Sequence, residues 1–109
     1  MALTGVHVEF CVGSDGDDSR LAAPVLRGQL SASQTMASAG TSNIAAPGVA
    51  GVMGSGYRTI LSISASAPIF FAVGPTPNAT TGPRRYMDPA NGGVDVFVNA
   101  GDVVAWILA

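Results

Sequence analysis

The sequence predicts an all-β fold, either a small β-sandwich of jelly-roll type or a barrel. Apolar and polar residues alternate with period two along much of the chain, and helical periodicity is nearly absent. Turns rich in glycine and proline separate the alternating segments, as in sandwiches and barrels. The chain has 109 residues, enough for one domain (1–109) that buries roughly 60–70% of its unfolded surface.

The first alternating segment, residues 3–12, predicts a half-buried strand. Side chains expected to face the core are Val6, Val8, Phe10 and Val12, and those expected on the opposite face are His7, Glu9 and Cys11. A turn rich in Gly and Asp follows at residues 13–18.

The middle of the chain has weaker patterns. Residues 21–26 predict a short strand, which Pro24 would restrict to a sheet edge, and residues 30–37 predict another. Residues 40–56 are small, rich in glycine and poorly patterned, and they predict a long loop or an extended arm.

The C-terminal half has clearer strands. Residues 57–65 alternate, with Thr59, Leu61, Ile63 and Ala65 on one face and Arg58, Ile60, Ser62 and Ser64 on the other. Further strands are expected at residues 69–73, 84–87, 94–98 and 103–108. The last of these is apolar on both faces, which indicates a central strand or a subunit contact.

The charge content limits the possible partners. Charged residues make up 11% of the chain against about 25% in typical domains, and the pI is about 4.9. Without a basic field we expect no nucleic-acid binding. Serines and Pro68 interrupt the apolar stretch from Ile60 to Val73, and residues 1–7 lack the pattern of a secretory signal, so we expect neither a membrane span nor export. So few charges predict a surface hidden in a homo-oligomer or a larger assembly.

No catalytic, metal or cofactor residues are expected. His7 is the only histidine, so a Ser-His or Cys-His site would have to use it; the alternative is a solvated or hydrogen-bonded strand histidine. His7 and Cys11 together are too few ligands for zinc. A calcium loop starting at Asp15 would need Glu at position 26, where Leu26 stands, so a solvated turn is favoured there.

The candidate interaction residues are Arg84, Arg85 and Tyr86, the only cluster of cations. Arg and Tyr often anchor interfaces; the alternative is an exposed strand whose arginines meet Asp88 or Asp95. Trp106 is expected in the core, although an exposed ring would suit a sugar platform.

Residues 57–109 resemble small structural proteins of bacteriophages and prophages. The resemblance lies in Pro68-Ile69-Phe70-Phe71-Ala72-Val73-Gly74, in Thr76-Pro77-Asn78-Ala79-Thr80 and in the final segment Ala100-Gly101-Asp102-Val103-Val104-Ala105-Trp106-Ile107. It implies a non-enzymatic virion component, first of all a capsid decoration or cement protein that binds the major capsid protein, commonly as a homotrimer. Alternatives are a tail, baseplate or receptor-binding component, or a small carbohydrate-binding module.

Overall fold

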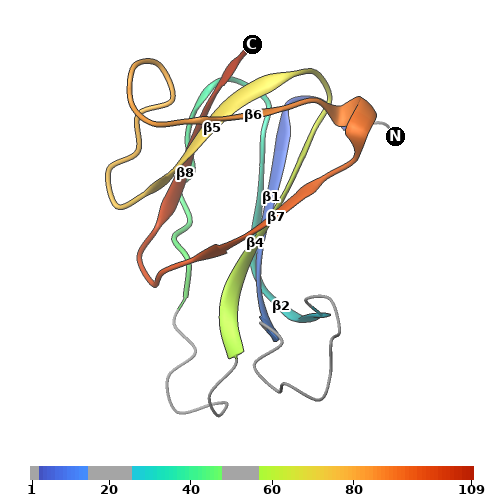
Figure 1. Ribbon diagram of the computed structural model, residues 1–109, viewed down its shortest axis with the longest axis vertical. Helices are drawn as coiled ribbons and strands as arrows, with labels where there is room; N and C mark the ends of the chain where they lie inside the picture. Colours follow the sequence, from blue (N-terminus) through green and yellow to red (C-terminus); the bar gives the residue numbers. More distant parts are fainter. Residues whose placement is uncertain (1–2, 15–25, 48–56) are drawn as a thin grey trace.

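The computed structural model describes residues 3–14, 26–47 and 57–109 (Figure 1). These residues form eight β-strands and one short 3-10 helix. The strands are β1 (Val6–Ser14), β2 (Leu26–Met36), β3 (Gly40–Thr41), β4 (Tyr57–Ala65), β5 (Ile69–Gly74), β6 (Arg85–Met87), β7 (Val94–Val98) and β8 (Val103–Leu108), and the helix η1 spans Pro89–Asn91. The predicted all-β class is confirmed.

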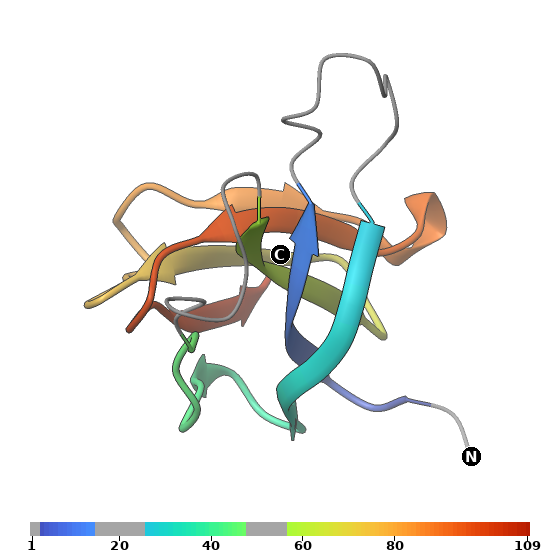
Figure 2. The ribbon, with the colours of Figure 1, turned by 90° about the horizontal axis from the view of Figure 1, so that it is seen from below.

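The strands form two antiparallel sheets of four. Sheet A has the order β2-β1-β4-β7 and sheet B the order β3-β8-β5-β6. The chain passes from β2 at the edge of sheet A to β3 at the edge of sheet B, and on the other side η1 joins β6 to β7 (Figure 2). Because the two sheets are separate, the domain is a sandwich and not a closed barrel.

The strand pairs are nested along the chain. β5 pairs with β6, β4 with β7 and β3 with β8, so each pair encloses the previous one in sequence. β1 lies between β2 and β4 and is antiparallel to both. This nested pairing is that of a jelly roll, in which one folded ribbon of paired strands contributes to both sheets. The strand beside β2 is β1, which precedes β2 in the chain.

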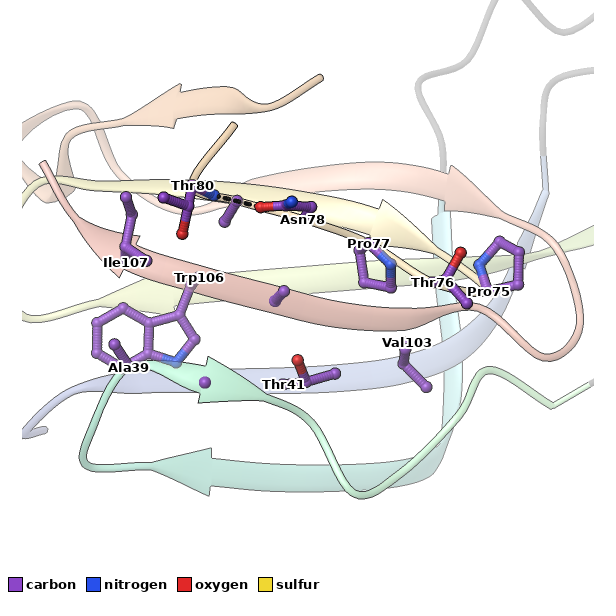
Figure 3. A pocket seen from close by; sticks show the side chains of 13 residues that line it. Ala39, Thr41, Pro75, Thr76, Pro77, Asn78, Thr80, Val103, Trp106 and Ile107 are labelled. Carbon is purple, nitrogen blue, oxygen red and sulfur yellow. Dashed lines mark hydrogen bonds between the residues drawn. The ribbon is translucent and has the colours of Figure 1, made fainter. Parts of the chain in front are cut away.

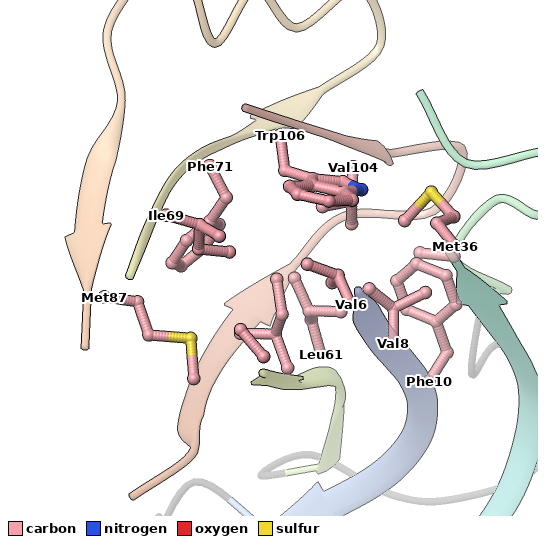
Figure 4. Close-up of a cluster of buried hydrophobic side chains, with 13 residues drawn as sticks. Val6, Val8, Phe10, Met36, Leu61, Ile69, Phe71, Met87, Val104 and Trp106 are labelled. Atoms are coloured by element: carbon pink, nitrogen blue, oxygen red, sulfur yellow. The ribbon is translucent and has the colours of Figure 1, made fainter. Parts of the chain in front are cut away.

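The core lies between the sheets and follows from the alternation. Sheet A directs Val6, Val8 and Phe10 inward from β1, and all three are fully buried. Figure 4 shows sheet B facing them with Phe71, Val104 and Trp106, while Met36 and Met87 lie at the two sides of the cluster. The predicted core position of Trp106 is confirmed, because its side chain is 3% exposed.

A second, smaller apolar cluster lies on the outer face of sheet B. Ala72, Ala105 and the partly buried Ile107 pack there against Ala79 from the loop between β5 and β6. This packing explains why residues 103–108 are apolar on both faces of the strand. β8 lies between β3 and β5, with the main core on one face and the loop between β5 and β6 on the other.

Residues 40–47, part of the stretch for which the sequence predicts a loop or arm, run along β8 at the side of the sandwich. β3 pairs with β8, and then the backbone N–H of Ser42 donates to Val104 O (2.7 Å). The buried Ser42 hydroxyl accepts from Val104 N (3.0 Å) and donates to Ile44 O (2.9 Å). Gln34 Oε1 accepts from Asn43 N (2.7 Å), which ties this segment to β2. Residues 48–56 lie outside the described residues, as do residues 21–25 of the expected short strand.

Gly5 joins β1 to the turn between β4 and β5. Its carbonyl accepts from Ser66 N (2.9 Å), and its N–H donates to Ser66 Oγ (2.9 Å). Gly5 has φ of +85°, and a Cβ atom there would lie 2.0 Å from Met36 O. Only glycine fits this position, because both the backbone angle and the close contact exclude a side chain.

Candidate functional site

The three predicted interaction residues lie on and beside β6, the edge strand of sheet B, but they do not form one surface. Arg84 precedes the strand, and its Nη1 donates to the carbonyl oxygens of Ala79 (3.0 Å) and Thr80 (3.3 Å). Its Cζ atom lies 3.9 Å from the centre of the Phe70 ring. Arg84 therefore fastens the loop between β5 and β6 to the outer face of sheet B.

Tyr86 lies on the same face as this arginine. Its ring contacts Phe70 edge to face, with centroids 5.6 Å apart and planes inclined at 62°. Tyr86 is nevertheless 56% exposed. One face of its ring thus completes a small aromatic group, while the rest of the side chain remains available to a partner.

Arg85 points away from Tyr86, as the alternation within a strand requires. It is exposed and makes no hydrogen bond or ion pair with any described residue. The arrangement in which Asp88 neutralises the arginines is not found: Asp88 caps η1 by accepting from Ala90 N (3.0 Å). Asp95 lines the same hollow as Arg85, but no ion pair joins Arg85 to any of the residues that the structure describes.

Two hollows adjoin Arg85 at the side of the sandwich where β6 and β7 form the edges. One, of about 430 Å³, is lined by Ile60, Arg85, Asp95, Val96 and Phe97. The other, of about 350 Å³, shares Arg85, Val96 and Phe97 with the first and extends to Phe71, Val73 and Pro83. We call the first of these the β7 cleft. Its combination of apolar walls, a partly exposed aromatic ring and an unpartnered arginine is typical of protein-binding surfaces.

A third hollow, of about 590 Å³, lies on the outer face of sheet B between β3 and residues 75–80 (Figure 3). Asn78 builds its wall: Oδ1 accepts from Thr80 N (2.9 Å) and Thr81 N (3.1 Å), and Nδ2 donates to Thr81 Oγ1 (3.0 Å). Trp106 contributes to the lining but is buried, and its Nε1 has no partner among the described residues. Without an exposed ring face Trp106 does not provide the stacking platform that a sugar site of this kind needs.

His7 lies on the outer face of sheet A in a short hydrogen-bonded chain. Its Nδ1 is 2.7 Å from Thr35 Oγ1 and its Nε2 is 3.1 Å from Glu9 Oε1. His7 is thus a hydrogen-bonded strand histidine. The His7 and Cys11 side chains are not joined: the Cys11 thiol is buried and donates to Ile60 O (3.9 Å). Among the described residues no three His, Cys, Asp or Glu side chains gather to hold a metal ion.

Two exposed apolar residues outside the predicted set belong to the outer face of sheet A. Phe97 on β7 is 44% exposed and Leu30 on β2 is 50% exposed. The alternation of Val94, Val96 and Val98 already directs Phe97 outward in the sequence. The outward direction of Leu30 cannot be read from alternation, because it depends on a register shift between Phe10 and Cys11 that places Leu30 opposite Cys11.

The candidate site is thus the β7 edge of the jelly-roll sandwich, formed by Arg85, Phe97 and the β7 cleft. No protein-family model matches the chain, and comparison with curated proteins and with solved structures finds no similar protein. Within the described residues, no helix has the length and apolar character needed to cross a membrane.

Proposed function

We propose that this protein is a non-enzymatic structural component of a bacteriophage virion, a capsid decoration or cement protein. It binds the major capsid protein as a homo-oligomer, a trimer in the simplest case, and stabilises the head shell. It assembles onto the particle in the host cytoplasm.

The observation that carries the proposal is the unpartnered Arg85 beside the partly exposed Phe97 at the β7 cleft. Arg85 has no hydrogen-bonded partner among the described residues, so a carboxylate or carbonyl group of another protein can bind it, and arginine and aromatic side chains are prominent among the residues that supply binding energy at protein interfaces. A cement protein needs such a surface, because it stabilises a shell by bridging neighbouring subunits.

The fold and the composition support the same class. Jelly-roll sandwiches occur in viral capsid proteins, although they also occur in lectins and cupins, so the fold alone does not decide the function. The phage-like segments form structural parts here: residues 69–74 are β5, residues 76–80 build the loop held by Asn78, and Asp102 closes the β7–β8 turn by accepting from Asn99 N (2.9 Å). The segments that carry the resemblance are therefore structural parts of this fold.

The test uses shells of the phage that encodes this chain, prepared without the protein. Purified wild-type protein is added, and the particles are imaged by cryo-electron microscopy and heated until they release DNA. We expect density at symmetric positions on the head and a higher release temperature. Arg85→Glu, which reverses the unpartnered charge without touching the core, should bind at least about tenfold more weakly.

Each other outcome contradicts the proposal. Labelling confined to the tail or baseplate would favour a tail component. Binding to host glycans, with no attachment to the head, would favour a carbohydrate-binding module, and its stacking residue would then be an exposed ring such as Tyr86, because Trp106 is buried. Equal binding by Arg85→Glu would exclude the β7 cleft as the binding surface.

A further inference from the structure

Asn91 is the only asparagine of the chain that a glycine follows. It ends the 3-10 helix η1, which joins β6 to β7 (Figure 1) and has Asp88 as its N-cap residue. Asn91 is exposed, and its side-chain amide makes no hydrogen bond to any residue that the structure describes. The side chain is therefore free to turn toward the backbone nitrogen of Gly92.

The other three asparagines lack this combination. The residue after each of them carries a Cβ atom, which hinders the approach of the asparagine side chain to the next backbone nitrogen. These pairs are Asn43-Ile44, Asn78-Ala79 and Asn99-Ala100. Asn78 is restrained further, because its Oδ1 accepts from Thr80 N (2.9 Å) and its Nδ2 donates to Thr81 Oγ1 (3.0 Å). At Gly92, by contrast, even an added Cβ atom would meet nothing within 4 Å, so the space beside this bond is open.

We propose that Asn91 is a site of spontaneous deamidation and that η1 sets its rate. The Gly92 nitrogen loses its proton to hydroxide from the solvent and attacks Cγ of Asn91. The bond between Cγ and Nδ2 breaks, Nδ2 takes a proton from water and leaves as ammonia, and a cyclic succinimide forms. Water then opens the ring at either carbonyl group. Opening at Cγ gives aspartate, whereas opening at the main-chain carbonyl gives isoaspartate, whose main chain contains an additional methylene group.

The helix η1 restrains the reacting nitrogen. Gly92 N donates to Pro89 O (3.0 Å), and Asn91 N donates to Asp88 O (2.9 Å). The Asp88 carboxylate caps the helix by accepting from Ala90 N (3.0 Å). The Gly92 nitrogen reacts when its hydrogen bond to Pro89 O opens, because a bonded N–H group holds its proton. A single 3-10 turn opens at a low free-energy cost, so Asp88 acts as a positioning residue that slows deamidation by holding η1 closed.

Deamidation changes both the charge and the main chain beside β7. The new carboxylate adds one negative charge to a chain whose net charge is −2. Isoaspartate lengthens the connection to β7, whose first residue, Val94, pairs with Ile63 and packs against the core. The reaction is therefore expected to loosen the start of this edge strand as the protein ages. It concerns the protein alone and does not rest on the proposed function.

The first experiment incubates the purified wild-type protein at physiological temperature and mildly alkaline pH. Peptide mass spectrometry measures the loss of each amide group, and methylation by an isoaspartyl methyltransferase detects isoaspartate. Asn91 should lose its amide at least about tenfold faster than Asn78 or Asn99, and isoaspartate should be among its products. Asn91→Gln should abolish the methylation, because a glutamine side chain would have to close a larger ring, which forms more slowly.

The second experiment tests the helix cap. Asp88→Ala removes the cap and should raise the rate of amide loss at Asn91 about fivefold. Asp88→Asn keeps a capping side chain without its charge and should react at the wild-type rate, which separates capping from charge. Asp102→Ala is the matched control, because Asp102 accepts from Asn99 N (2.9 Å) in the turn between β7 and β8, and it should leave the rate at Asn91 unchanged. Far-ultraviolet circular dichroism checks that each variant is folded.

Three results overturn the inference. Loss of the amide at Asn91 that is no faster than at Asn78 or Asn99 would show that it is not a preferred site. Aspartate as the only product would indicate direct hydrolysis without the succinimide. An unchanged rate in Asp88→Ala, or an equally raised rate in Asp88→Asn, would show that capping of η1 does not restrain the reaction.

Discussion

Arg84 and Phe70 form a contact that holds the loop between β5 and β6 to its sheet: the guanidinium carbon lies 3.9 Å from the ring centre. The same arginine binds two loop carbonyl groups. Its neighbour Arg85 makes no bond to the described residues, so the two adjacent arginines have different roles.

Arg84→Ala should therefore lower the free energy of unfolding by about 1–2 kcal/mol, from the lost charged hydrogen bonds and the lost ring contact. Arg85→Ala should change it by less than about 0.5 kcal/mol, as expected for an exposed side chain without partners. Urea denaturation of the two variants measures both values. Equal losses would show that Arg84 does not fasten the loop.

Gly5→Ala should lower the free energy of unfolding more than most replacements of one small residue by another. Its cost combines a positive φ with a clash against Met36 O, and we expect a loss of at least about 3 kcal/mol. Gly92 is the matched control, because its φ is +87° but a Cβ atom there meets nothing within 4 Å. Gly92→Ala should cost about 1–3 kcal/mol, from the backbone angles alone, because φ of +87° with ψ of −173° is a combination that essentially only glycine adopts. Similar melting temperatures for the two variants would contradict the role of the Met36 contact.

Ser42→Ala should lower the free energy of unfolding by about 1–3 kcal/mol, because it leaves the buried N–H of Val104 without its side-chain acceptor. Ser64 is exposed on β4, so Ser64→Ala serves as the control and should be neutral within about 0.5 kcal/mol. Thermal unfolding followed by circular dichroism distinguishes them.

Trp106 should tolerate phenylalanine far better than alanine. Trp106→Phe removes a buried Nε1 donor that has no partner among the described residues, and this offsets part of the lost packing, so we expect a cost below about 1.5 kcal/mol. Trp106→Ala opens a cavity in the core and should cost about 3–5 kcal/mol. Chemical denaturation measures the loss in free energy of unfolding for each variant. Similar losses for Trp106→Phe and Trp106→Ala would contradict this prediction.

The fold class was predictable because alternation is a local property of the sequence. Val6, Val8 and Phe10 identify β1, and the apolar run of residues 103–108 correctly indicated a central strand. Cys11 and Ile60 were placed on the face opposite the core and are nevertheless buried, because alternation gives a direction but does not show what covers a face.

The candidate interaction surface was less predictable, because it depends on register. The cluster of Arg84, Arg85 and Tyr86 was visible in the sequence. The pairing of β5 with β6 then places Phe70 beside Tyr86, which a local pattern does not reveal. Leu30 needed still more information: a single extra residue in β2 reverses its direction, and alternation assumes that no such residue exists.

The nested strand pairs, β5 with β6, β4 with β7 and β3 with β8, also affect the order and rate of folding. Among these nested pairs the hairpin of β5 and β6 closes the shortest loop, whereas β3 meets β8 only after the segments between them have come together, because the loop-closure entropy rises with chain separation. Long-range pairing of this kind slows folding relative to local structure. The nested pairs are therefore expected to form outward from β5 and β6, with β3 joining β8 last.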